Sequence, residues 1–185
     1  DKLYTWDEFE PNLYEIDYEI KCCGKSDVRK IKFGIRDFGT KGTHFTINDI
    51  PTFIRGAVNS CEFPITGYPP MSYEEWKKVM KVYKDYGLNC IRFHSWCPPE
   101  SAFQVADELG LYLQVENSDW RFTVGKDEAT NAFYLDEAQR IFKEYGNHPS
   151  FAFFCEGNEL VGKGCVDFLK EMLTEWKKDS RHLYV

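Results

Sequence analysis

The residues best suited to chemistry lie at positions 151–159, where a short apolar run ends in acidic and amide side chains. Residues 151–155 have the length and apolar character of a fully buried strand. In a parallel α/β barrel, catalytic residues lie at the carboxyl ends of strands. A carboxyl group there can protonate a glycosidic oxygen, and a neighbouring amide can bind a sugar hydroxyl. Glu159, with Asn158 directly before it, fits this chemistry. The alternative is an acidic loop without a catalytic role.

Four further side chains lie where other predicted strands end. Arg92 belongs to a strand at 90–94 and either holds a catalytic carboxylate or forms a structural ion pair with Glu116. Glu116 ends the next strand and can line a sugar pocket. His94 is either a packed histidine or a ligand. Trp120 lies in a loop at the same end, where its ring stacks on a sugar face or on neighbouring loops.

Composition excludes several classes of function. The net charge of −7 and the pI near 5.2 argue against nucleic acid as a partner, because phosphate binding needs a basic surface. No apolar run is long enough to span a membrane. The seven cysteines lack a Cys-x-x-Cys pair and the four histidines lack a His-Glu-x-x-His pattern. Neither a disulfide framework nor a metal site is therefore predicted, and no cofactor is expected.

The first 40 residues have the alternating pattern of strands. Residues 14–20 place tyrosine and isoleucine on one face and acidic residues on the other. A turn is expected at 24–27 and a second strand at 29–37. Two strands are marginal alone, so we interpret them as the last strands of a β-sandwich.

From about residue 41 the pattern becomes strand followed by helix. A small hairpin turning at Asn48-Asp49 precedes a strand at 54–59. Ser72 with Glu75 forms a capping box for a helix that runs up to Tyr86, with Gly87 directly after its end. Later strands are expected at 90–94, 111–116, 151–155 and 183–185, with helices at 100–109, 131–145 and 166–178. Such alternation predicts a parallel sheet. Long aromatic loops and the lack of a glycine-rich phosphate motif favour a (β/α)8 barrel over a doubly wound sheet.

Several motifs in order resemble glycoside hydrolase family 2, which includes β-galactosidases, β-glucuronidases and β-mannosidases. They cover nearly the whole chain: Trp6-Asp-Glu-Phe-Glu-Pro-Asn-Leu-Tyr14, Phe33-Gly-Ile-Arg36, Asn48-Asp-Ile-Pro-Thr-Phe-Ile-Arg-Gly56, Tyr86-Gly-Leu-Asn-Cys-Ile-Arg92, Ala106-Asp-Glu-Leu-Gly-Leu111, and Asn147-His-Pro-Ser150 with Gly157-Asn-Glu159. The resemblance implies an α/β fold, with the last strands of an immunoglobulin-like β-sandwich in residues 1–40 and the first half of a TIM barrel in residues 41–185.

In such enzymes the glutamate of the Gly-Asn-Glu motif is the general acid/base, which implies that role for Glu159 and sugar binding for Asn158. The resemblance also implies a retaining mechanism whose nucleophile lies beyond residue 185, a carbohydrate substrate, and a periplasmic or secreted location. Two loops depart from the family pattern, at 57–63 and at 92–98, where the histidine His94 comes one position early. The sugar specificity of well-known members is therefore not transferred.

Two further expectations follow for the chain itself. A half barrel should be inactive alone, and its unpaired strand edges should favour association with another copy. The alternatives are a non-catalytic carbohydrate-binding or scaffold protein on the same fold, and a doubly wound α/β domain with another function.

Overall fold

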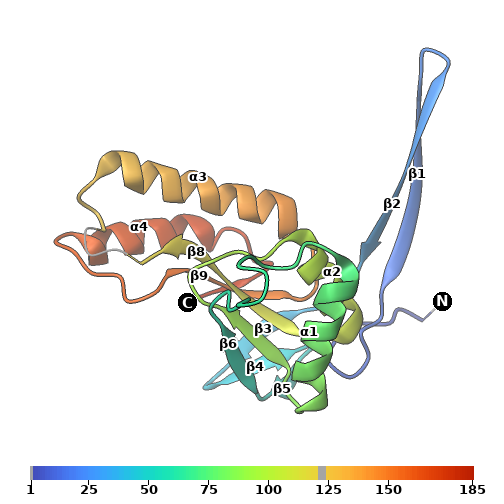
Figure 1. The fold of residues 1–185 in the computed structure, drawn as a ribbon, viewed down its shortest axis with the longest axis horizontal. Coiled ribbons are helices and arrows are strands. Elements are labelled where there is room, and N and C mark those ends of the chain that lie inside the picture. Colours follow the sequence, from blue (N-terminus) through green and yellow to red (C-terminus); the bar gives the residue numbers. More distant parts are fainter. Residues whose placement is uncertain (1, 121–123) are drawn as a thin grey trace.

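The computed structural model describes residues 2–120 and 124–185 of the chain (Figure 1). Within these residues the strands form three sheets: a two-stranded hairpin, a three-stranded antiparallel sheet and a five-stranded parallel sheet. None of the helices in these ranges combines the length and the apolar character that a membrane crossing requires.

The five-stranded parallel sheet has its strands in the order of the sequence, β6-β7-β8-β9-β10. A helix connects each strand to the next, which confirms the predicted strand–helix repeat and its fifth strand. The strands are β6 (Gly56–Asn59), β7 (Cys90–Phe93), β8 (Tyr112–Asp119), β9 (Phe151–Gly157) and β10 (Leu183–Tyr184).

Capping residues mark several ends of the helices. The helices are α1 (Tyr73–Asp85), α2 (Glu100–Leu109), α3 (Glu128–Tyr145) and α4 (Cys165–Trp176). Ser72 accepts a hydrogen bond from the amide of Glu75 at the start of α1, as predicted. Gly110 ends α2 at a φ of 70°. Helix α3 begins three residues earlier than predicted, because Asp127 caps the amides of Ala129 and Thr130.

All four of these helices pack on the same face of the parallel sheet, where they form one apolar core. A doubly wound sheet would instead reverse its strand order and carry helices on both faces, so that alternative is not observed. Burying each large apolar side chain of this core stabilises the fold by about 1.5–3 kcal/mol. The core joins strand residues Ile91, Phe93, Leu113, Val115 and Phe154 to helix residues Trp76, Met80, Phe103, Ala106, Ile141, Phe142, Met172 and Trp176.

The other face of the parallel sheet is covered at its amino-terminal end by the small antiparallel sheet. This sheet consists of β3 (Phe38–Lys41), β4 (His44–Ile47) and β5 (Ile50–Thr52), and it turns between β4 and β5 at Asn48-Asp49, as predicted. The Phe38 ring packs on Tyr112 and Phe153, with ring centroids 5.5 and 5.1 Å away. The apolar side chains between the two sheets form a second core, and the carboxyl-terminal half of this face of the parallel sheet lies outside it. Strand β3 was not predicted. It spans Phe38–Lys41 and therefore crosses the domain boundary predicted between residues 40 and 41.

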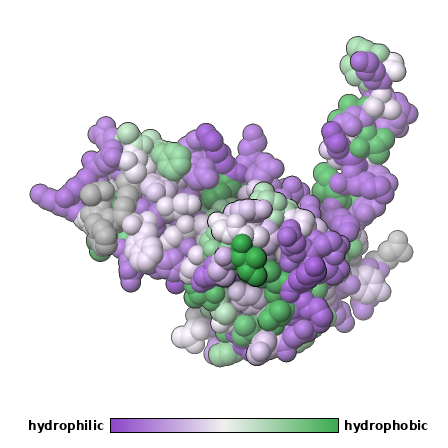
Figure 2. Space-filling model, viewed as in Figure 1, coloured by the Kyte–Doolittle hydropathy of each residue, from purple (hydrophilic) through white to green (hydrophobic). Residues whose placement is uncertain are grey.

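The hairpin of β1 (Tyr14–Cys22) and β2 (Lys25–Phe33) projects from the rest of the molecule (Figure 1). The second strand is confirmed, but its predicted bounds of 29–37 and the turn at 24–27 were wrong, because the strand spans Lys25–Phe33. Cys23 and Gly24 have φ of 51° and 73°, which gives a two-residue turn, so pairing resumes at Lys25. Apolar atoms (green) lie among polar ones (purple) along this hairpin in Figure 2.

Candidate active site

Glu116 has a fully buried carboxylate within β8, and the prediction that it ends this strand was wrong, because β8 continues to Asp119. Its Oε1 accepts hydrogen bonds from Arg92 Nε at 2.6 Å and from Gln114 Nε2 at 3.0 Å, and its Oε2 accepts one from the Ser95 amide at 2.8 Å. Removing a charge from water is costly unless donors replace the lost hydration. Three donors, one of them cationic, do so here, and the bond to Glu116 raises the pKa of Arg92.

Arg92 joins three neighbouring strands through its guanidinium group. Besides its bond to Glu116, it donates from Nη2 to Asn158 Oδ1 at 2.8 Å. Arg92 lies on β7, Glu116 on β8, and Asn158 directly follows β9. Because the planar fork of arginine fixes both acceptors, the amide of Asn158 is held in one orientation. Of the two roles predicted for Arg92, the ion pair with Glu116 is observed, and the guanidinium contacts Asn158 rather than Glu159.

Glu159 is exposed next to this network and contacts a second group of predicted residues. Its Oε2 accepts a hydrogen bond from Trp120 Nε1 at 3.2 Å. The His94 ring meets the Trp120 ring edge to face, with centroids 5.0 Å apart. Trp120 is 54% exposed, so much of its ring area is accessible. The φ of Glu159 is 50°, a left-handed conformation that costs a residue with a Cβ about 1–2 kcal/mol.

Gly157 explains how Asn158 and Glu159 reach this place. A Cβ at Gly157 would lie 2.0 Å from the Asp119 carbonyl oxygen, so this approach of β9 to β8 requires glycine. The amide of Asn158 then donates to the same carbonyl at 3.0 Å. The register between β8 and β9 shifts between Glu116 and Asp119. An irregularity of this kind re-aims side chains at a strand end.

Glu156 is buried with Asn117, whose Nδ2 donates to Glu156 Oε2 at 2.6 Å and to the Tyr134 carbonyl of α3 at 3.0 Å. Through Asn117, Glu156 is therefore linked to the helical layer rather than to the Arg92–Glu116 network.

Two residues of the network were missed by sequence reasoning. Gln114 lies two positions before Glu116, and the two-residue period of a strand puts both on one face, so this signal was available. The amide of Ser95 carries no sequence signal, because its contribution depends on a φ of 57° after β7.

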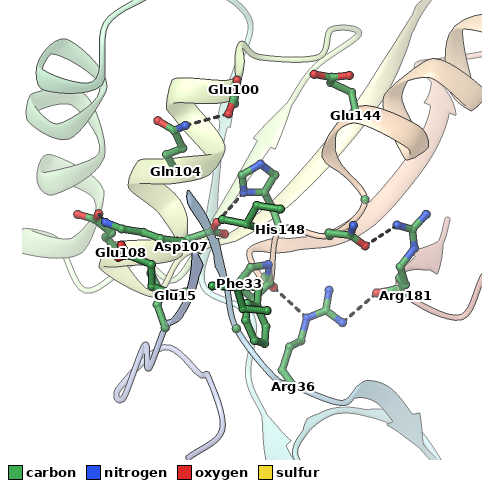
Figure 3. A pocket seen from close by; sticks show the side chains of 18 of the residues that line it. Glu15, Phe33, Arg36, Glu100, Gln104, Asp107, Glu108, Glu144, His148 and Arg181 are labelled. Atoms are coloured by element: carbon green, nitrogen blue, oxygen red, sulfur yellow. Dashed lines mark hydrogen bonds and ion pairs between the residues drawn. The ribbon is translucent and has the colours of Figure 1, made fainter. Parts of the chain in front are cut away.

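A large groove of about 1380 Å³ lies at the opposite end of the parallel sheet (Figure 3). Its walls include the hairpin and the loop before β9, where His148 Nδ1 and Asp107 Oδ2 are 2.6 Å apart. Arg36 and Arg181 lie in the same wall. None of the predicted site residues lines this groove, so the candidate site and the groove are separate features.

Comparison with known proteins shows what the chain is similar to. No family model matches it. The chain is 29% identical over 150 residues to a β-galactosidase of Thermoanaerobacterium thermosulfurigenes, covering 80% of this chain and 20% of that protein. It is 31% identical over 162 residues to a putative β-glucuronidase of Formosa agariphila, covering 83% and 15%. A solved β-glucuronidase of Parabacteroides merdae matches 98% of this chain and 24% of its own, with a TM-score of 0.86 and 21% identity.

A solved glycosyl hydrolase family 2 member from Bacteroides cellulosilyticus also matches, with a TM-score of 0.82 and 22% identity over 98% of this chain and 24% of that one. The chain is related to glycoside hydrolase family 2. The two curated relatives are named as glycosidases, and the solved structures show that the chain shares their fold. The chain spans a fifth or less of the length of the two curated relatives.

Proposed function

We propose that the chain is part of a retaining β-glycosidase of family 2, in which Glu159 is the general acid/base. The observation that carries this proposal is the position of Asn158 and Glu159 directly after β9, beside the Arg92–Glu116 pair at the carboxyl end of a parallel sheet. An exposed carboxylate at that end can protonate a departing glycosidic oxygen and later deprotonate water.

The residues around Glu159 are proposed to bind the sugar. Asn158, oriented by Arg92, would contact a hydroxyl close to the anomeric carbon. Trp120 offers an exposed ring for stacking on a sugar face, and His94 supports that ring from its edge. Glu116 is fully buried by its three donors, so we propose that it acts on substrate through Arg92 and Asn158 rather than by direct contact.

A retaining mechanism requires a second carboxylate about 5–5.5 Å from the first as nucleophile. We propose that this nucleophile lies outside residues 1–185, on the second half of a barrel of which β6–β10 form the first half. The sequential strand order and the single helical layer support this arrangement. The boundary between a preceding sandwich domain and the barrel, predicted at residue 40, would then fall before β3, because that strand pairs with β4, and the 185-residue chain alone would be inactive.

The test uses the longer protein that contains this chain, assayed on a panel of nitrophenyl and alkyl β-glycosides. Glu159→Gln should abolish turnover of alkyl glycosides, which need protonation of the leaving group. Formation of the glycosyl-enzyme from nitrophenyl glycosides should fall much less. Azide needs no general base, so it should restore turnover of nitrophenyl substrates in this variant.

The matched control is Glu156→Gln, three residues away and directed toward α3, which should keep the activity of the unchanged protein. Equal losses on both substrate types, or no rescue by azide, would contradict the role of Glu159. A folded longer protein without activity on any glycoside of the panel, but with measurable sugar binding, would favour the carbohydrate-binding alternative.

A further inference from the structure

The tip of the β1–β2 hairpin carries two adjacent thiols, Cys22 and Cys23, for which glycoside chemistry has no use. Their sulfur atoms lie 3.2 Å apart, and both residues are exposed. Consecutive side chains of a strand normally point to opposite faces of the sheet. The backbone must therefore depart from strand geometry for the two sulfurs to meet.

That departure occurs at Cys23, whose φ of 51° lies in the left-handed region. The two-residue turn between β4 and β5 provides a comparison within the same chain. There Asn48 and Asp49 occupy φ of 52° and 66°, and their short polar side chains tolerate this conformation well. A cysteine side chain gives no such tolerance, so Cys23 is a less favourable residue for its turn position than asparagine or aspartate would be.

We propose that Cys22 and Cys23 form a dithiol site that chelates one thiophilic, three-coordinate centre of the trivalent-arsenic class. Two sulfur bonds of about 2.3 Å, a typical metal–thiolate length, meeting near a right angle would place the sulfurs about 3.3 Å apart. The observed separation of 3.2 Å matches this without rebuilding the turn.

Direct oxidation of the pair to a disulfide fits the geometry less well. Neighbouring Cα atoms lie about 3.8 Å apart, whereas disulfides usually join Cα atoms about 4.4–6.8 Å apart. Chelation is therefore favoured over cross-linking.

Phenylarsine oxide is a suitable probe, because its reaction needs no oxidant. Two S–H bonds break, two As–S bonds form, and the oxygen on arsenic leaves with both protons as water. Arsenic stays trivalent, so no electrons are transferred.

The experiment treats the reduced 185-residue chain with one equivalent of phenylarsine oxide, then alkylates it and maps the cysteines by mass spectrometry. We expect both Cys22 and Cys23 to be protected. Cys61 is also exposed and has a φ of 62°, but its sequence neighbours are not cysteines, so it should stay reactive. Ethanedithiol should release the arsenical, and a monothiol should not.

Substitution gives an independent readout. Cys22→Ser and Cys23→Ser should each weaken arsenical binding about 100-fold or more, because the second bond is intramolecular only in the intact pair. Cys61→Ser is the matched control and should bind as the unchanged chain does. Protection of a single cysteine, equal protection of Cys61, or single variants that bind within threefold of the unchanged chain would each overturn the proposal.

Discussion

The Glu116 carboxylate shows how a single residue can organise the candidate site without reaching substrate. It accepts hydrogen bonds from Arg92, Gln114 and Ser95, and Arg92 in turn orients Asn158. A charge buried in this way is retained only while its partners stay in place. The geometry of the proposed sugar ligand therefore depends on a side chain one strand away.

Glu116→Ala should lower the free energy of unfolding by about 3–5 kcal/mol, because it leaves the Arg92 guanidinium without its carboxylate. Urea unfolding of the 185-residue chain measures this change. The control is Asp85→Ala, which removes an exposed ion pair with Lys81 and should cost about 0.5 kcal/mol or less. Similar losses for the two variants would show that the buried pair contributes no more than a surface pair.

His182 should make stability depend on pH. It is 3% exposed, its Nδ1 lies 2.8 Å from the Phe151 carbonyl oxygen, and burial lowers its pKa from 6.5 to about 4. Between pH 6.5 and 4 the unfolded chain therefore binds a proton that the folded chain does not. Stability should fall by about 3 kcal/mol as the pH is lowered through this window, and this contribution should change little below it.

Urea unfolding at several pH values tests this expectation. His182→Asn keeps an N–H donor for the Phe151 carbonyl but does not titrate, so its stability should depend less steeply on pH between 6.5 and 4. Parallel pH profiles for the variant and the unchanged chain would rule out His182 as the source.

Among the elements, the two helix-ending glycines provide a matched pair. Gly110 and Gly87 both follow helices with φ near 70° to 75°. A Cβ at Gly110 would lie 2.8 Å from the Glu8 carbonyl oxygen, whereas nothing lies within 4 Å of a Cβ at Gly87. Gly110 therefore also creates space for the amino-terminal segment to pack against the end of α2.

Gly87→Ala should cost about 1 kcal/mol, the price of a left-handed residue with a Cβ. Gly110→Ala should cost clearly more, because the segment around Glu8 must also move. Thermal unfolding of both variants tests this difference. Equal effects would mean that the amino-terminal segment contributes little at this contact.

The regular elements could be predicted from sequence because their signals are local. The Ser72 side chain, which accepts from the Glu75 amide, and the backbone of Gly110 mark helix ends through local hydrogen bonds, and these boundaries agree with the structure. The start of β2 was missed because the two-residue turn depends on Cys23 adopting a positive φ, which its type does not indicate. Strand β3 was missed because it is four residues long and depends on pairing with β4.

The candidate site was only partly accessible from sequence. The strand ends that carry Arg92, Glu116 and Asn158 could be placed at one edge, because parallel strands share their direction. The contact of Arg92 with Asn158 could not be predicted, since it depends on the register shift between β8 and β9. The roles of Glu159 and Trp120 in sugar chemistry remain predictions.

At the scale of the whole molecule, the projecting hairpin is the feature most exposed to association. Ile16, Ile20 and Ile31 share one face of it and are 50%, 59% and 49% exposed. Exposed apolar side chains on a sheet with open edges favour pairing with another copy. The parallel sheet adds two more open edges, at β6 and β10.

Ile16→Lys should therefore reduce self-association of the chain, measured by sedimentation velocity across a range of concentrations. Glu19→Lys changes the opposite face of the same strand and serves as the control. A monodisperse monomer before any substitution would contradict the expectation. If both variants dissociated the chain equally, net charge rather than the apolar face would be responsible.

The sequential strand order allows the parallel sheet to fold while the chain is still being synthesised on the ribosome. Each strand of the parallel sheet pairs with the strand synthesised just before it, so the sheet can grow by addition as the chain emerges. The amino-terminal segment cannot dock as soon as it is synthesised, because its partners come later in the chain. Trp6 Nε1 donates to the Asp107 carbonyl. Arg36 donates to the carbonyls of Pro149 and Phe151. Trp6 must wait for α2, and Arg36 for β9, before either side chain can dock. We expect fusions to a force-sensitive arrest peptide to report the docking of Arg36 only once β9 has left the exit tunnel, and an earlier signal would refute this order of events.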